Sequence, residues 1–137
     1  MESAFSSSVS SPAASIKGMG MITLYISDIE RSEEWYCSKL GFQRAAEQNL
    51  SPGVTLQAGD VTLYLTKADA QRDGISRAGD FPGIALCFMV GSVKQSYEAM
   101  LAAGVTIAGD YYQPGPSFAS VQLADPDEIV IELWGKP

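Results

Sequence analysis

Hydrophobic and polar residues alternate along several short segments of the chain, and this alternation predicts strands. The first half has a strand at 21–26 and two more at 54–58 and 61–66, with a tight turn at Gly59-Asp60 between them. A short segment at 42–47 leaves the first helix and precedes these two strands. In the second half the same pattern predicts strands at 84–90, 105–107, 118–123 and 129–134, with a turn at 125–128 joining the last two.

Two segments have helical periodicity instead. The first ends at Gly41, and its inward stripe consists of Ile29, Ser32, Tyr36 and Leu40. Ser27 and Glu30 have the spacing of a capping box, which predicts the helix start. The second helix covers 93–103 and ends before Gly104; its inward residues are Val93, Tyr97 and Met100 or Leu101. Trp35 and Tyr36 are predicted to belong to the core.

Both halves therefore have the order strand, helix, strand, strand, strand, repeated at a spacing of roughly 60 residues. The pattern predicts an α+β fold of two βαβββ modules whose curved mixed sheets form a trough. Residues 1–18, rich in Ser and Ala, are expected to be a disordered tail before a single domain at 19–137. Within that domain we expect module one at about 20–66, a linker or mobile loop at 67–82, and module two at about 83–135.

The alternation also assigns the two faces of each strand. One face is aliphatic and should pack under the helices; it comprises Ile22, Leu24, Ile26, Val61, Leu63, Leu65, Ile84, Leu86, Phe88, Ile129, Ile131 and Leu133. The opposite face mixes aromatic, thioether and polar groups, as small-molecule sites do. The candidate ligand-binding residues on this side are Met21, Tyr25, Gln57, Tyr64, Cys87, Met89, Phe118, Glu132 and Trp134.

Composition excludes several classes of function. The 137 residues carry a net charge of −7 and no cluster of basic residues, so nucleic acid is not an expected partner. Histidine is absent, which removes Ser-His and Cys-His nucleophiles and imidazole metal ligands. No apolar run is long enough to span a membrane. The two cysteines, Cys37 and Cys87, are expected to be free thiols in the cytoplasm.

Three stretches resemble the vicinal oxygen chelate superfamily, which includes glyoxalase I, extradiol dioxygenases and bleomycin-resistance proteins. Residues 22–42 are similar to the opening strand and helix of that family, and 97–105 to the end of its second helix. The segment at 125–133, Asp-Pro-Asp-Glu-Ile-Val-Ile-Glu-Leu, resembles its closing hairpin, with Glu128-Ile129 in place of Gly-Asn. The resemblance covers about residues 20–135 and implies the paired-module fold and a homodimer.

The resemblance also implies where a metal ligand would stand on each module. The matching positions are Met21, Tyr64, Ala85 and Glu132. Only Glu132 is an ordinary ligand of a divalent metal in a nitrogen and oxygen site, and such a site needs at least three. We therefore predict neither a metal site of the family type nor a cofactor.

The missing metal ligands and the acidic, aromatic character of the chain favour a metal-free protein that binds a small hydrophobic or cationic aromatic molecule. The resemblance to bleomycin-resistance proteins implies that this molecule is an antibiotic or a similar compound. Glu132 would receive a cationic group or be satisfied structurally, and Tyr25 and Trp134 would stack on the ligand or make packing or dimer contacts. Cys87 is interpreted as an apolar wall residue, and 111–116 as a rim loop or a simple connection.

Two alternatives remain open. The chain could be a metal-independent isomerase, lyase or hydrolase in which Glu132 works with Tyr25 or Tyr64 as acid and base. It could also be a small interaction domain whose trough accepts a peptide or a partner domain. Neither the sequence pattern nor the resemblance names the ligand.

Overall fold

The computed structural model describes residue 13 and residues 17–45, 52–67 and 84–137. Its elements are β1 (Ile22–Tyr25), α2 (Ile29–Leu40), β2 (Gln43–Arg44), β3 (Val54–Ala58), β4 (Val61–Thr66), β5 (Ala85–Val90), α3 (Val93–Ala102), β6 (Thr106–Gly115), β7 (Phe118–Ala124) and β8 (Val130–Gly135). Most of the predicted tail and of the predicted linker at 67–82 lies outside the described residues. No helix of the described part is long and apolar enough to cross a membrane.

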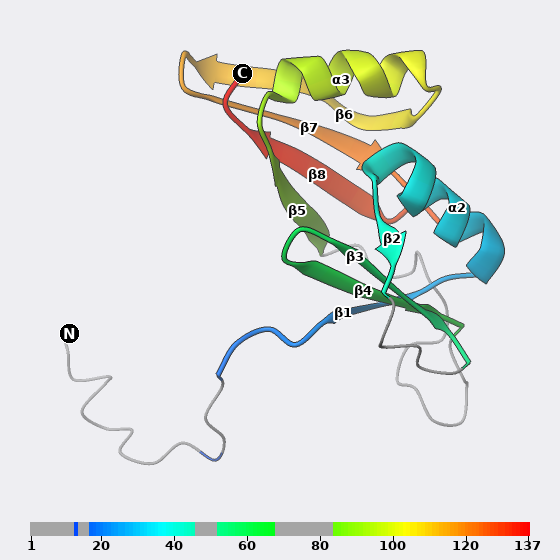
Figure 1. Cartoon of the computed structure of the whole chain (residues 1–137). Helices are drawn as coiled ribbons and strands as arrows, with labels where there is room; N and C mark the ends of the chain where they lie inside the picture. The colour runs from blue at the N-terminus through cyan, green and yellow to red at the C-terminus, as the bar shows by residue number, and fades with distance from the viewer. Residues whose placement is uncertain (1–12, 14–16, 46–51, 68–83) are drawn as a thin grey trace.

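The strands form two four-stranded sheets with the same topology (Figure 1). The first sheet has the order β1-β4-β3-β2 and the second has the order β5-β8-β7-β6. In each sheet the first strand of the module runs parallel to the last, and the remaining pairs are antiparallel. The predicted α+β fold of two βαβββ modules is confirmed, with sheets that are curved but not closed.

The first helix starts one residue later than the capping box predicts. Asp28, rather than Ser27, is the N-cap, and its side chain accepts a hydrogen bond from the backbone N–H of Arg31 at 3.1 Å. The Ser27 hydroxyl accepts instead from the Arg31 guanidinium at 2.7 Å. The predicted end is confirmed: Gly41 has a φ of 77°, a left-handed conformation that glycine adopts without strain.

The strand after the second helix is much longer than predicted. Instead of a short strand at 105–107 and a rim loop at 111–116, β6 extends to Gly115, and only Pro116 and Ser117 form the turn to β7. Its register with β7 shifts three times, between Ile107 and Gly115. These irregularities interrupt the two-residue period, so the sequence pattern conceals the strand.

A single hydrophobic core joins the two modules. It takes the aliphatic faces of both sheets together with α2 and α3; the fully buried members include Tyr36, Leu56, Leu63, Leu65, Val93, Leu123 and Ile131. The rings of Phe42 and Phe88, one from each module, lie 5.9 Å apart. Two predicted core residues are exposed instead: Ile84 precedes β5, and Leu101 lies on the outer side of α3.

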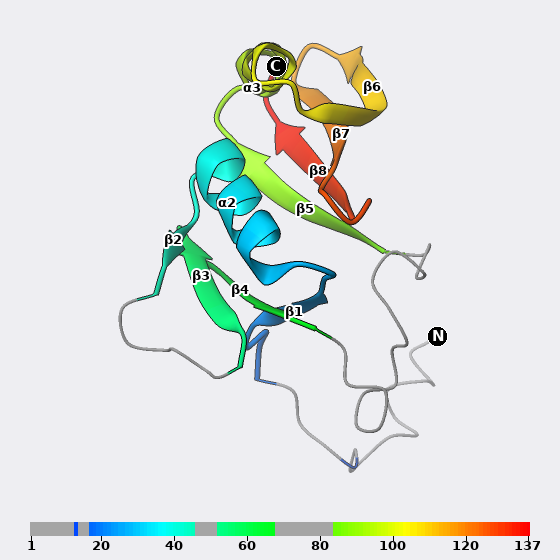
Figure 2. The same cartoon turned by 90° about the vertical axis from the view of Figure 1, so that its right-hand side faces the viewer.

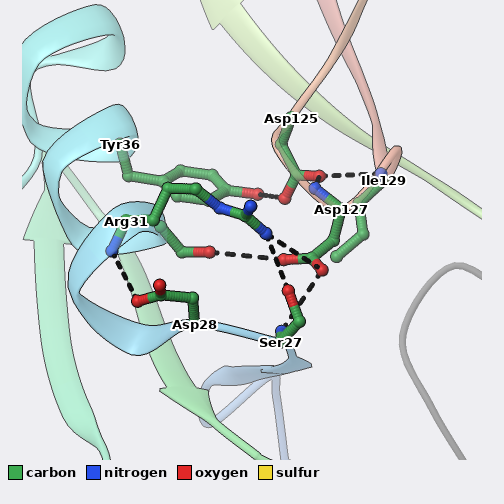
Figure 3. Close-up of polar contacts among 8 residues, drawn as sticks. Ser27, Asp28, Arg31, Tyr36, Asp125, Asp127 and Ile129 are labelled. Atoms are coloured by element: carbon green, nitrogen blue, oxygen red, sulfur yellow. Dashed lines mark hydrogen bonds and ion pairs between the residues drawn. The ribbon is translucent and has the colours of Figure 1, made fainter.

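Polar contacts also connect the modules, between the start of α2 and the turn before β8 (Figure 3). The Tyr36 hydroxyl donates to Asp125 Oδ2 at 2.7 Å, and the other Asp125 oxygen accepts from the backbone N–H groups of Asp127 and Ile129. Asp127 in turn accepts from the backbone N–H of Ser27 at 3.2 Å. Burial is the main cause that raises the pKa of Asp125.

Helix α2 lies between the two sheets, as both views show (Figures 1 and 2). Because both aliphatic faces belong to the shared core, the opposite faces of the two sheets lie on the outside of that core. We call these the open faces. Within the described residues of one chain, the two open faces therefore do not enclose a common trough.

Candidate functional site

The open face of the second sheet carries a row of polar side chains in register across neighbouring strands. Cys87 of β5 is paired with Glu132 of β8, which is paired with Gln122 of β7. The Gln122 amide donates to Glu132 Oε1 at 3.2 Å. The half-buried carboxylate is thus held by one side-chain donor, and Oε2 has no side-chain partner among the described residues.

Gly109 of β6 extends the same row and makes room for it. A Cβ atom at this position would lie 2.7 Å from Gln122 Oε1, closer than real side chains approach. The absence of a side chain at Gly109 therefore lets the Gln122 amide lie beside Glu132. The interpretation of the sequence missed both residues; counting the register outwards from the turn at 125–128 would have found Gln122.

The adjacent row is mainly apolar and aromatic. Its in-register members are Met89, Trp134, Ser120 and Tyr112. Met89 is 73% exposed and Tyr112 is 60% exposed, which is unusual for large apolar side chains. The ring of Phe118 lies 6.2 Å from that of Trp134, at a tilt of 48°. This row provides a platform on which a planar ligand could stack beside the carboxylate.

Cys87 has an exposed thiol with little nucleophilic character. Partial burial raises the pKa of the Cys87 thiol, and the negative charge of Glu132 raises it further. A nucleophilic thiolate needs a cationic neighbour, and here the neighbour is an anion. The role of Cys87 as a wall residue stays a prediction.

The remaining predicted ligand residues belong to the first sheet. Tyr64 pairs with Thr23 on one side and Thr55 on the other, and its hydroxyl accepts from the backbone N–H of Gly53 at 3.0 Å. Gln57 is exposed, and Tyr25 is half-buried at the end of β1. Met21, 38% exposed, precedes β1.

The structure thus brings five of the nine candidates onto one surface and leaves four on another. Cys87, Met89, Phe118, Glu132 and Trp134 share the open face of the second sheet, whereas Met21, Tyr25, Gln57 and Tyr64 belong to the first module. The two groups lie on separate sheets whose open faces do not face each other. Whether any of these residues binds a ligand stays a prediction.

The donor groups do not fit a metal ion of the family type. The described residues contain no group of three or more acidic, cysteine or histidine side chains that could hold one. Of the four matching positions, Tyr64 has its hydroxyl engaged by Gly53, Ala85 offers only a methyl group, and Met21 is a thioether. Glu132, the fourth, is a carboxylate whose Oε1 is bonded to the Gln122 amide.

The two βαβββ modules place the chain in a class of small α+β proteins built from paired modules. Residues 18–133 match the Glyoxalase/Bleomycin resistance protein/Dioxygenase superfamily, and the chain belongs to this superfamily. No curated protein matches the sequence significantly.

Solved structures with the same fold are numerous. The antibiotic-binding protein TnmS3 from Streptomyces sp. CB03234 superposes with a TM-score of 0.67 at 20% identity, covering 88% of this chain and 96% of that one. TioX from Micromonospora sp. ML1 superposes with a TM-score of 0.63 at 17% identity, covering 85% of this chain and 94% of that one. Lactoylglutathione lyase from Agrobacterium tumefaciens superposes with a TM-score of 0.64 at 22% identity, covering 88% of this chain and 93% of that one. These superpositions show that the chain shares its fold with an antibiotic-binding protein and with an enzyme.

Proposed function

We propose that the protein binds a small hydrophobic or cationic aromatic molecule, such as an antibiotic, on the open face of the second sheet, without a metal ion. The observation that carries this proposal is the half-buried Glu132 carboxylate beside the Trp134–Phe118 pair. The carboxylate oxygen that Gln122 leaves open can accept from an N–H group of the ligand, while the rings cover its planar part. The same fold occurs in the antibiotic-binding protein TnmS3, which supports a binding role of this kind.

The net charge of −7 adds to the preference for a cationic ligand, because it raises the local concentration of cations. The two cysteines are free thiols in the described chain, which suits action in the reducing cytoplasm. Sequestration of a harmful compound is the simplest role for such a protein.

The experiment is a fluorescence titration with 9-aminoacridine, a planar aromatic cation, and with acridine-9-carboxylate as its anionic counterpart. We expect the cation to bind more tightly. Glu132→Gln should weaken cation binding roughly tenfold, the effect of about 1.4 kcal/mol. Trp134→Ala should weaken it about fivefold. Glu98→Gln, which removes an exposed charge on α3, is the matched control. Equal affinity of Glu132→Gln and Glu98→Gln for the cation would contradict the proposal.

The alternative, a metal-independent enzyme, needs a proton-exchanging partner for Glu132. The partner that the structure gives this carboxylate is the Gln122 amide, which does not titrate. Tyr25 and Tyr64, the candidate partners, lie on the other sheet, and the Tyr64 hydroxyl is bonded to the backbone of Gly53. The geometry therefore favours binding, and any turnover that Glu132→Gln abolishes would restore the enzymatic alternative.

A homodimer would complete the site. Strands β1 and β5 each pair on one side only within the described chain, so each has an edge to which a strand of a second copy can add. A second copy could also cover the open faces that one chain leaves outside the core. Native mass spectrometry, with and without added Mn, Ni or Zn, tests both points: we expect a metal-free dimer, and a tightly held metal or a monomer at micromolar concentration would contradict this part.

A further inference from the structure

A cavity of about 570 Å³ lies where the two modules meet, and it differs from the open-face site. Its walls come from the end of α2, the β3–β4 turn at 58–61, residues 87–90 of β5, and α3. Its volume is within the range of small-molecule sites, about 300–1,000 Å³, which often lie between structural units. Glu132 and Trp134 do not line it, although Cys87 and Met89 do.

The inner walls of the cavity are apolar. Its large apolar lining residues are Leu40, Phe42, Phe88, Met89, Met100 and Leu133. Phe42 and Phe88 come from different modules, and their rings lie 5.9 Å apart. An apolar ligand body would therefore contact both modules at once and replace water against these side chains.

Two side chains of opposite charge, Lys39 and Asp60, line the cavity, and they differ in burial. Lys39 is half-buried, and its ammonium group donates to the carbonyl of Ala103 at the end of α3, at 3.1 Å. The ion pairs found in the described part of the chain, Arg31–Asp127 and Arg44–Glu33, do not include Lys39. Its charge is thus uncompensated by a carboxylate there, and two of its N–H groups remain for another acceptor.

Asp60 is exposed on the turn between β3 and β4. Salt and water screen an exposed carboxylate more strongly than a half-buried ammonium group. Lys39 therefore contributes more to the field inside the cavity than Asp60 does, and its contribution favours an anion.

We propose that this cavity binds a small molecule with an apolar body and one anionic group, such as an aromatic or short-chain carboxylate or sulfonate. The anion accepts from the Lys39 ammonium group, and the body packs against Phe42 and Phe88. The ligand class is opposite in charge to the one that suits Glu132. The cavity shares Cys87 and Met89 with the open face but not Glu132, Trp134 or Phe118, so it is a second site whose cationic group, Lys39, lies off that face.

The test uses 1-anilinonaphthalene-8-sulfonate, an aromatic monoanion, with the full chain in its native oligomeric state. Lys39→Met keeps the apolar stem and removes the charge; it should raise the dissociation constant about tenfold, the effect of losing one charge-assisted hydrogen bond. Lys39→Arg, which keeps the charge, should bind within about twofold of the wild type, and Asp60→Asn should bind as tightly or about twofold more tightly. Unchanged affinity of Lys39→Met would overturn the proposal.

A second variant tests the location. Ser96→Phe places a ring at the cavity wall and should abolish binding, whereas Trp134→Ala on the open face should leave it unchanged. Loss of binding in Trp134→Ala but not in Ser96→Phe would place the probe on the open face and overturn the cavity site. If Ser96→Phe does not fold, the location is tested in the wild type by the amide chemical shifts of residues 39–42 and 58–61 on addition of the probe. The absence of changes at these residues would also overturn the cavity site.

Discussion

The hydroxyl of Tyr36 donates a 2.7 Å hydrogen bond to Asp125, from a residue that is completely buried in module one to a buried carboxylate in module two. The ring of Tyr36 is held in turn by edge contacts with Trp35 and Phe42. This bond lies inside the core that both modules share, where an unpaired carboxylate oxygen has no access to bulk water. It is therefore a specific determinant of how the modules dock.

Tyr36→Phe should destabilise the fold by about 1.5–3 kcal/mol, because it removes a donor from a buried charged acceptor. Chemical unfolding in urea measures the change. Tyr112→Phe, at a position 60% exposed, should change stability by less than about 0.5 kcal/mol. Equal losses in the two variants would show that the Tyr36 hydroxyl contributes nothing specific.

The raised pKa of Asp125 predicts a pH dependence of stability. The ordinary pKa of this group is 3.8, and in the folded protein it is higher, mainly because of burial. Between the two values the folded state binds more protons than the unfolded state, so this group's contribution to stability falls as pH rises through that window.

Asp125→Asn removes this contribution. The stability of the wild type minus that of the variant should therefore decrease as pH rises from 3.8 and become constant above the folded pKa. Urea unfolding at a series of pH values measures the difference, in which the other carboxylates cancel. A difference that increases with pH over this range would show that the pKa of Asp125 is lowered rather than raised.

Glu128 is the one residue other than glycine with a positive φ in the described chain, at 66°. A residue with a side chain costs about 1–2 kcal/mol in this left-handed conformation, and glycine avoids that cost. Glycine also loses more conformational entropy on folding, which offsets part of the gain. Glu128→Gly should stabilise the protein by about 0.5–1 kcal/mol. As a matched control, Glu98→Gly in helix α3 should destabilise it by about 1 kcal/mol. Thermal and urea midpoints that fall in both variants would contradict the expectation.

Gly135 lies beside the second sheet's edge strand with a φ of 148°, and a Cβ atom there would lie 2.6 Å from the carbonyl oxygen of Val90. Gly135→Ala should cost about 1–3 kcal/mol, because the backbone partner cannot move without breaking the β5–β8 pairing. Gly91→Ala, whose Cβ would enter open space, should have little effect on the unfolding free energy. Similar stability of the two variants would show that the backbone of β5 can move away from the added Cβ atom at little cost in free energy.

The thiol of Cys87 should respond to the charge of Glu132. Partial burial and this carboxylate raise the pKa of Cys87 above its ordinary value of 9.0. In a Cys37→Ala background, Glu132→Gln should lower the pKa and accelerate alkylation by iodoacetamide at pH 8 by about two- to fivefold. The pH dependence of the alkylation rate measures this, and identical profiles would show that the two side chains do not interact.

Sequence patterns predicted regular elements well and long-range geometry poorly. Residues 54–58 and 61–66 each alternate regularly, so the two strands and the turn at Gly59-Asp60 between them were predicted with their bounds. Strand β6 was not, because its register shifts break the alternation. The pairing of Glu132 with Gln122 was missed because it depends on hairpin register, although both residues were visible as polar positions.

The arrangement of the candidate site could not be predicted for a different reason. Alternation shows which face of its own sheet a side chain occupies, but it does not show how one sheet is placed relative to another. Tyr64 and Glu132 occupy equivalent faces of equivalent strands, yet the shared core lies between their sheets. That placement results from α2, whose buried side carries Ser32 and Tyr36 toward Asp127 and Asp125.

The contact between Tyr36 and Asp125 also bears on the order of assembly. The two residues are 89 positions apart, so the helix emerges during synthesis long before the turn that accepts its hydroxyl. In any structure that module one forms before then, this hydroxyl is hydrated, and the shared core is complete only when the last hairpin is present. Such a distant closing contact makes folding slower and leaves the apolar side of module one exposed to other chains in the meantime.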